Sequence, residues 1–130
     1  MSIELLNAST ERLIRGLDIA ARSHRLTAEN VANVDTPGYK PRHLDFAAAL
    51  DAATGELELS RTDGRHLAGI HPGPAVTVDL TPRRPDGNAV DPEREMADLT
   101  ANAGLYATLA QAVRGRLHAL RAAIEEGQQS

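Results

Sequence analysis

Residues 91–127 read DPEREMADLTANAGLYATLAQAVRGRLHALRAAIEEG. Apolar side chains recur in this stretch at alternating steps of three and four residues, a spacing typical of a helix that packs against other helices. Asp91 suits an N-cap, Pro92 the first helical position and Gly127 a stop. We therefore predict a helix over residues 91–127. Its apolar positions, called the C-terminal stripe below, are Met96, Leu99, Ala103, Tyr106, Ala110, Val113, Leu117, Leu120 and Ile124.

A second and weaker heptad pattern occupies residues 1–34, where Thr10, His24 and Thr27 interrupt it. We predict an N-terminal helix there, with a start between Ile3 and Thr10. Its end is better defined, because residues 35–38 read Asp-Thr-Pro-Gly. Pro37 and Gly38 suit the second and third positions of a type II turn that begins at Thr36. The positions of this N-terminal stripe are Leu6, Thr10, Leu13, Leu17, Ala20, His24, Thr27, Val31 and Val34.

The middle of the chain, residues 35–90, holds all but one of the seven prolines and is expected to be largely irregular. A short helix is predicted between Leu44 and Ala53. Alternating side chains over Glu56–Ser60 and Ala75–Leu80 predict two short strands that could pair as a minor hairpin. The predicted fold is mainly α, a single unit over residues 1–130 in which the two terminal helices pair like a coiled coil.

Composition narrows the function classes. A chain of 130 residues fits one small domain, and with only 2% aromatic residues its core has to consist of Ala, Leu, Val and Ile. The net charge of −4 argues against a nucleic-acid partner. The lack of cysteine excludes disulfides, thiolate nucleophiles and Cys-ligated metals. We expect neither a cleaved secretory signal nor a membrane span.

The histidines do not form a recognisable metal or catalytic pattern. His24 lies in the N-terminal stripe and is expected to pack or to form a hydrogen bond. His66 and His71 lack the helical spacing and the additional ligands of a zinc site. His43 and His118 are isolated in sequence and are expected to be solvated. We therefore expect no enzyme activity, metal, cofactor or small-molecule substrate.

A pair of helices with narrow apolar stripes buries little surface, so we expect the free monomer to be partly unfolded and to gain stability from neighbouring subunits. The alternative is a helical hairpin that folds alone. On the first interpretation, the stripes are subunit interfaces. The residues assigned to them are Leu13, Leu17, Ala20, Val31 and Val34, together with the whole C-terminal stripe.

Residues 32–40 read ANVDTPGYK and follow the predicted N-terminal helix. This segment resembles the Ala-Asn-x-x-Thr-Pro-Gly-Tyr motif of the rod and hook family of bacterial flagellar axial proteins. Every fixed position of that motif is present, as Ala32, Asn33, Thr36, Pro37, Gly38 and Tyr39. The resemblance implies a packing role for this turn in an assembled tube, rather than an ordinary tight turn.

Residues 86–96, DGNAVDPEREM, resemble the entry to the C-terminal helix in the B-type branch of short proximal rod proteins. The motif positions are Asp86, Gly87, Asn88, Val90 and Asp91. The C-type branch is similar in length and shares the Thr-Pro-Gly-Tyr turn, but usually lacks this second string. It stays open as an alternative, as does a soluble helical adaptor or export chaperone.

The resemblance implies a structural subunit of the flagellar basal-body rod, a tube that transmits torque for motility. The partners it implies are other copies of the chain, other rod proteins, and membrane-ring or export-gate components at the base of the rod. It also implies a location in the periplasmic rod, reached through the flagellar type III apparatus without removal of a signal peptide.

Overall fold

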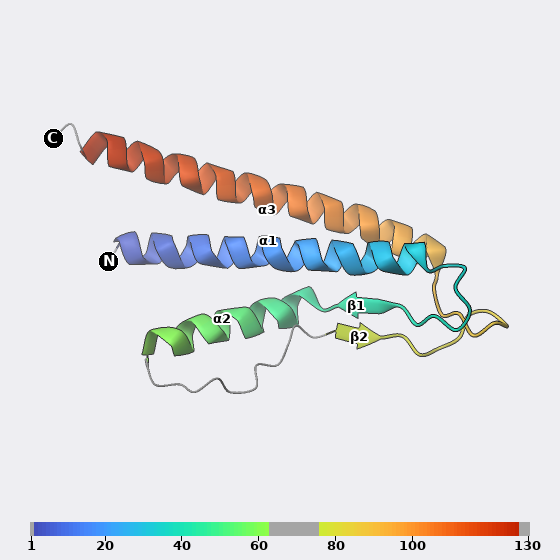
Figure 1. Ribbon diagram of the computed structural model, residues 1–130. Coiled ribbons are helices and arrows are strands. Elements are labelled where there is room, and N and C mark those ends of the chain that lie inside the picture. The colour runs from blue at the N-terminus through green and yellow to red at the C-terminus, as the bar shows by residue number, and fades with distance from the viewer. Residues whose placement is uncertain (1, 63–75, 128–130) are drawn as a thin grey trace.

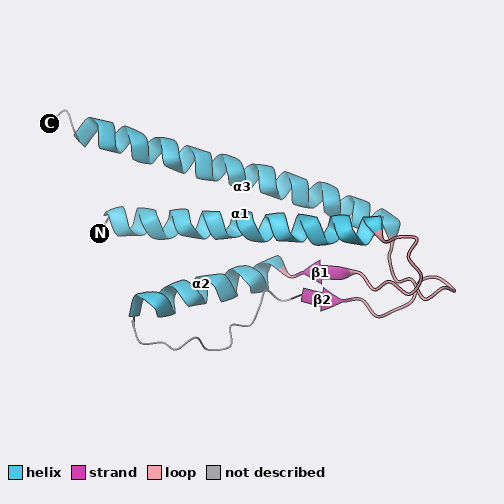
Figure 2. Ribbon diagram, viewed as in Figure 1, coloured by secondary structure: helices cyan, strands magenta, loops and turns pink. Residues whose placement is uncertain are grey.

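The computed structural model describes residues 2–62 and 76–127. Its elements are α1 (Ser2–Ala32), β1 (Arg42–Leu44), α2 (Phe46–Thr62), β2 (Val76–Val78) and α3 (Pro92–Gly127). Figure 1 shows an elongated arrangement in which α1 lies between α3 on one side and α2 with the two strands on the other. The two chain ends lie at one end of the molecule, and the loops that join the elements gather at the opposite end (Figure 2).

The predicted helical fold is confirmed, and so is the start of the C-terminal helix. The predicted start of the N-terminal helix, between Ile3 and Thr10, is wrong, because α1 already begins at Ser2. Helix α3 begins at Pro92, and the Asp91 carboxylate accepts a hydrogen bond from the Arg94 N–H at 3.3 Å as an N-cap does. Helix α1 ends at Ala32, so Val34 lies just beyond it. The type II turn is also confirmed, because Gly38 has a φ of 73° and the Tyr39 N–H donates to the Thr36 carbonyl at 3.3 Å.

Helix α3 contacts α1 along one flank of the C-terminal stripe. Asn102 accepts a hydrogen bond from Ser23 and donates one to Thr27, while Leu109 packs near Gly16. Nearer the chain ends, the long Arg116 side chain donates to the Ser9 hydroxyl at 2.6 Å. Positions 102, 109 and 116 are one heptad apart and turned away from the centre of the stripe. Part of the stripe therefore stays exposed, at Met96, Tyr106, Leu117 and Ile124, which are 43–62% accessible.

A methyl group at Gly16 is expected to stabilise this contact. A Cβ atom there would lie 3.7 Å from Leu109 and 3.9 Å from Phe46, which is ordinary van der Waals distance. Gly16→Ala should raise the free energy of unfolding by about 0.5–1 kcal/mol, because alanine loses less backbone entropy in a helix and its methyl group is buried here. Thermal unfolding followed by circular dichroism measures the effect. Gly104→Ala, where a Cβ meets nothing within 4 Å, should give a smaller gain, and a loss at Gly16 would contradict the packing.

The middle of the chain differs from the prediction in the extent of its short helix and in the strand that pairs with residues 76–78. The short predicted helix is confirmed but extends to Thr62, so the strand predicted over Glu56–Ser60 is wrong. Alternation at Leu57 and Leu59 suggested a strand, yet Glu and Leu are strong helix formers, and extending an existing helix is less costly than starting a new element.

The strand predicted within Ala75–Leu80 is present as β2, and its partner is β1. The two strands pair antiparallel with Arg42 opposite Val78, His43 opposite Thr77 and Leu44 opposite Val76. Just after β2, the Thr81 N–H donates to the Asp79 carboxylate and holds the pKa of Asp79 below its ordinary value. Because the charged form is the one stabilised, this support is present near neutral pH and is lost as the solution is acidified.

Candidate functional site

The two sequence motifs meet at the loop end of the molecule, although about 50 residues separate them. The Ala89 N–H donates to the Tyr39 carbonyl at 3.0 Å, and the Lys40 ammonium donates to the Gly87 carbonyl at 2.8 Å. Gly87 has a φ of 83°, and a Cβ atom on it would be in ordinary van der Waals contact with the Gly38 Cα, at 3.6 Å. We call this region, residues 30–43 together with residues 84–95, the junction.

Asn88 closes the end of α1. Its side chain is fully buried, and its Nδ2 atom lies within hydrogen-bond distance of three carbonyls, those of Asn33, Val34 and Thr36, at 3.1, 3.1 and 2.7 Å. Its Oδ1 atom accepts the Val90 N–H at 2.8 Å. These carbonyls belong to the turn that follows α1 and lie outside the regular hydrogen bonding of the helix, so an amide that reaches across from the second motif satisfies them. This contact fixes the exit of α1 to the entry of α3.

Asn30 forms the other centre of the junction. Its Nδ2 atom donates to the Arg42 carbonyl at 2.8 Å and to the Glu95 carboxylate at 3.0 Å. Its Oδ1 atom accepts the Arg42 N–H at 3.0 Å and the Tyr39 hydroxyl at 3.2 Å. One fully buried amide thereby joins α1, the Thr-Pro-Gly-Tyr turn, β1 and α3. Every hydrogen-bonding position that an amide offers is in use, as burial requires.

Glu95 is a carboxylate with only 1% of its surface exposed. His43 Nε2 lies 2.7 Å from its Oε1 atom, while Asn30 donates to Oε2. A buried carboxylate needs such partners, and its place in the first turn of α3 adds the favourable field of the helix N-terminus. The expectation that His43 is solvated is therefore wrong, because strand β1 carries it to the start of α3.

His43, Glu95 and Asp98 each offer a ligand atom within 4.8 Å of the others, which is close enough to hold a metal ion. Both oxygens of Glu95 are already hydrogen-bonded, one to Asn30 and one to His43, however. These contacts account for the closeness of the three groups, and we call them a structural clasp because they hold α1 and β1 to α3.

The other histidines lie away from this clasp or outside the part of the chain that is described. His66 and His71, at which the sequence predicts no zinc site, lie outside the described residues. His118 is exposed, as expected. The Nδ1 atom of His24 is buried and lacks a hydrogen-bond partner in the described structure.

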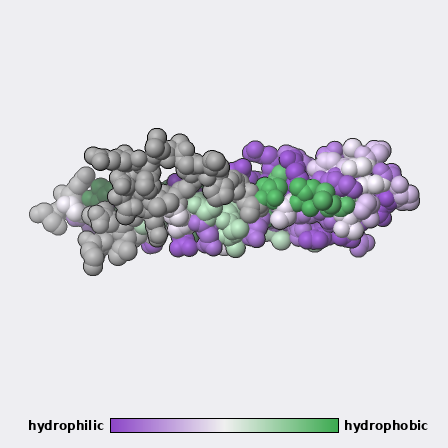
Figure 3. Space-filling model, turned by 90° about the horizontal axis from the view of Figure 1, so that it is seen from below, coloured by the Kyte–Doolittle hydropathy of each residue, from purple (hydrophilic) through white to green (hydrophobic). Residues whose placement is uncertain are grey.

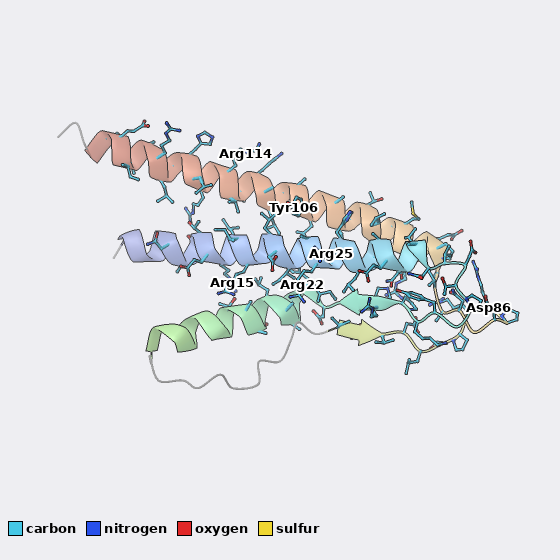
Figure 4. All side chains as sticks on the ribbon, viewed as in Figure 1. Arg15, Arg22, Arg25, Asp86, Tyr106 and Arg114 are labelled. Carbon is cyan, nitrogen blue, oxygen red and sulfur yellow. The ribbon has the colours of Figure 1, made fainter. Side chains whose placement is uncertain are left out.

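The remaining motif residues support the turn. Thr36 donates its hydroxyl to the Asn33 side chain at 3.1 Å, and Asn33 donates to the Glu29 carbonyl at 2.8 Å. Asp86 accepts the Asn88 N–H at 3.0 Å and lies among the loops at the end opposite the termini (Figure 4). Val90 is buried, whereas Ala32 and Pro37 are exposed.

Sequence reasoning missed Asn30, Glu95, His43, Lys40 and Arg84 as members of the junction. Arg84 donates to the Val34 carbonyl at 3.0 Å and so places a positive charge at the end of α1. The missed residues are isolated polar positions whose partners lie far away in sequence. Asn30 lies outside the N-terminal stripe, so the heptad pattern gave no signal that it is buried.

The structure places the predicted interface residues in two settings. Ala20 has no exposed surface and belongs to the packing within the chain. Leu13, Leu17, Val31 and Val34 are half-buried. In the C-terminal stripe, Leu99, Ala110, Val113 and Leu120 are half-buried, and the exposed members are Met96, Ala103, Tyr106, Leu117 and Ile124.

Gly38 is expected to be intolerant of β-branched side chains for a conformational reason alone. A Cβ atom there meets nothing within 4 Å, but the φ of 73° disfavours any residue with a side chain. Gly38→Val should lower the free energy of unfolding by about 1–3 kcal/mol, and Gly38→Asn by less, because asparagine tolerates positive φ. Chemical denaturation compares the two variants. Equal losses would show that side-chain volume, and not backbone conformation, controls this position.

The paired terminal helices, the hydrogen-bonded junction and the exposed apolar stripe define an elongated helical building block of a protein assembly. The chain is 34% identical over 119 residues to the flagellar basal body rod protein FlgB of Salmonella typhimurium, covering 80% of this chain and 83% of the relative. It is 32% identical over 123 residues to FlgB of Proteus mirabilis, covering 85% and 89%. The chain belongs to the FlgB family of flagellar basal body rod proteins.

FlgB of Bacillus subtilis is 27% identical and aligns over 128 residues, which are 96% of this chain and 99% of that protein. The match therefore covers both terminal helices and the junction. No family model matches the chain. These relatives favour the B-type rod interpretation over the C-type and adaptor alternatives. Within the described residues, no helix combines the length and apolarity that a membrane span requires.

Proposed function

We propose that this protein is a self-assembling structural subunit of the proximal rod and acts through its surfaces rather than through catalysis. The proposal depends mainly on the exposed part of the C-terminal stripe. The junction holds α3, the helix that carries this stripe, in a fixed position relative to α1. Four large side chains, Met96, Tyr106, Leu117 and Ile124, stay 43–62% accessible in the isolated chain. Packing against neighbouring subunits would bury this apolar surface.

The junction gives the subunit the stiffness that a drive shaft needs. Asn30 and Asn88 join the end of α1 to the start of α3 through buried hydrogen bonds, and the Glu95–His43 contact adds strand β1. A buried network in which every group is satisfied has one favoured arrangement, so the subunit resists rotation of one helix relative to the other. Torque applied to one subunit would then pass to the next without being lost in deformation.

The partners in this proposal are other copies of the chain, other rod proteins and components of the membrane ring or export gate at the rod base. The location is the periplasmic part of the basal body, reached by export without cleavage of a signal peptide. The interface comprises the half-buried N-terminal positions Leu13, Leu17, Val31 and Val34 and the C-terminal stripe, with residues 1–130 acting as one unit. Ala20 supports it from within the chain.

A charge in the stripe tests this function. Leu117→Asp should abolish incorporation into the rod and swimming in a strain that lacks its own copy of this protein, because burying an unpaired carboxylate costs about 2 kcal/mol or more at each subunit contact. Leu117 is 54% exposed, so the isolated chain should keep its helical content. Basal-body purification followed by detection of the chain gives the readout.

Gln111→Asp is the matched control, since Gln111 is exposed on the same helix outside the stripe. This variant should enter the rod as the unmodified chain does. Normal swimming with Leu117→Asp would show that the stripe is not a subunit interface. Absence of the unmodified chain from basal bodies would contradict the proposed function itself.

A further inference from the structure

The clasp leaves the Glu95 carboxylate without a lysine or arginine beside it. Glu95 has only 1% of its surface exposed, and its partners are the Asn30 amide and the His43 imidazole. Among the described residues, no lysine or arginine lies within ion-pair distance of this carboxylate. A charged carboxylate is rarely buried unless a cation or a metal ion compensates it. The charge of Glu95 is therefore a feature that the proposed function does not explain.

A second carboxylate adds to this negative charge. Asp98 follows Glu95 by three residues on α3, so the two side chains lie on the same face of the helix. One ligand atom from each of Glu95, Asp98 and His43 lies within 4.8 Å of the other two. The Arg94 Nε atom is 3.8 Å from Asp98, but both of these side chains are well exposed, and such an ion pair contributes little. The group of three residues therefore favours an added cation.

The donor atoms suit a zinc ion. Zinc binds imidazole nitrogen and carboxylate oxygen at about 2.0–2.2 Å, and sites with three protein ligands keep a fourth position for water. His43 Nε2 and Glu95 Oε1 are 2.7 Å apart and need to separate to roughly 3.3 Å to share a tetrahedral ion. Rotation of the His43 side chain, which is 23% exposed, can provide this change. Calcium and magnesium suit the group less well, because they prefer oxygen ligands.

Asn30 already orients the carboxylate of Glu95. Its Nδ2 atom donates to Oε2 at 3.0 Å, which leaves Oε1 facing His43. Asn30 is itself held by the backbone of Arg42 and by the Tyr39 hydroxyl. A hydrogen bond that fixes a ligand in this way typically changes metal affinity by about 10–100-fold. The amide that forms part of the clasp therefore also prepares Glu95 as a ligand.

The three residues lie where a hydrated ion can reach them. The side chain of Asp98 is 44% exposed, so one ligand of the group is open to water. Seen from below, the loop end of the molecule presents mostly hydrophilic and weakly polar residues, apart from the exposed apolar side chains of Val76, Val78 and Leu80 (Figure 3). An ion can therefore enter past Asp98 and bind the buried oxygen of Glu95.

We propose that His43, Glu95 and Asp98 bind one zinc ion, with water as the fourth ligand. Zinc takes the place of the proton between His43 Nε2 and Glu95 Oε1, and the neutral imidazole keeps its proton on Nδ1. The imidazole comes from β1 and the two carboxylates from the start of α3, so the ion ties these two elements together. Its charge compensates the buried carboxylate, and zinc binding strengthens the junction.

Calorimetric titration of the purified full chain, first freed of metal with a chelator, tests the site with Zn²⁺ as the probe. One ion should bind per chain with a Kd of about 10 μM or lower. Saturating zinc should raise the midpoint of thermal unfolding, because the ion binds the folded chain. Magnesium at the same concentration should leave that midpoint unchanged.

Two substitutions separate the zinc site from the clasp. Asp98→Asn and His43→Gln should each weaken zinc binding by about tenfold or more, since each removes one of three ligands. Asp98 takes no part in the clasp, and a glutamine in place of His43 can still donate to Glu95. Circular dichroism should therefore show equal helicity in the metal-free chains. With Co²⁺ as a second probe, the visible absorption of the bound ion should change in His43→Gln.

Two exposed residues of α3 provide matched controls. His118→Gln and Glu93→Gln should bind zinc as the unmodified chain does, because both residues lie outside the group of three. A double variant, His66→Gln with His71→Gln, should also keep its affinity.

Three results would each overturn the zinc site. They are a lack of binding at zinc concentrations up to about 1 mM, an unchanged affinity in Asp98→Asn, and loss of binding in the double variant of His66 and His71. Incorporation of the chain into basal bodies is measured separately and does not depend on any of these results.

Discussion

Asn88→Asp is expected to lower the free energy of unfolding by about 3–5 kcal/mol, although the two side chains have almost the same shape. The amide nitrogen that faces the carbonyls of Asn33, Val34 and Thr36 becomes a carboxylate oxygen. A buried negative charge then faces three acceptors and has no donor beyond the Val90 N–H. Denaturant unfolding of the purified chain at fixed concentration measures the loss.

Asn7→Asp provides the matched control, because Asn7 is exposed on α1 and the charge there stays hydrated. It should change stability by less than about 0.5 kcal/mol. If Asn88→Asp were as mild as this control, the amide of Asn88 would not close the end of α1, and the motif at residues 86–91 would need another explanation.

Asn30→Asp is expected to have an effect of similar size at the other centre of the junction. It places a carboxylate 3.0 Å from the Glu95 oxygen and removes the donor to the Arg42 carbonyl. Two buried carboxylates at this distance repel each other, and the backbone acceptor loses its partner, so we expect a loss of about 3–5 kcal/mol. Helicity and denaturant unfolding report the loss.

Combining Asn30→Asp with Glu95→Gln separates the charge effect from the lost backbone contact. In the double variant the amide introduced on α3 can donate to the carboxylate introduced on α1, which reverses the direction of that hydrogen bond. The double variant should recover about 1–2 kcal/mol relative to the sum of the single changes. Simple additivity would mean that Asn30 and Glu95 do not interact directly.

The junction explains why two separated motifs occur in one chain. Residues 32–40 form the turn that leaves α1, and residues 86–91 supply the groups that hold the turn in place. Gly38 and Gly87 adopt positive φ angles that other residues rarely adopt, while Asn88 satisfies the carbonyls of the turn that follows α1. The motifs are therefore two halves of one structural unit.

Local sequence signals were sufficient for the terminal helices and for the turn. The steps of three and four residues, the Asp91 cap and the Pro37–Gly38 pair each act over a few residues, so the sequence reports them directly. The same local reasoning failed at Glu56–Ser60, where alternation suggested a strand and the preceding helix continued through the segment.

The flank of α3 that contacts α1 was not predictable from the stripe alone. Heptad spacing indicated an apolar face, but polar contacts at Asn102 and Arg116 turn part of that face away from α1 and leave Leu117 and Ile124 exposed. Hydrogen bonds across the helix pair decide this rotation, and their partners lie 75 and 107 residues away in the sequence.

The sequence by itself determined two long amphipathic helices, a fixed turn between the first helix and the middle segment, and a resemblance to flagellar axial proteins. Only the tertiary structure decided that Asn30, His43 and Glu95 form one buried cluster and that Asn88 closes α1. The reason is that burying a polar group costs free energy unless a partner forms a hydrogen bond with it. Those partners come from segments that meet only when the chain has folded.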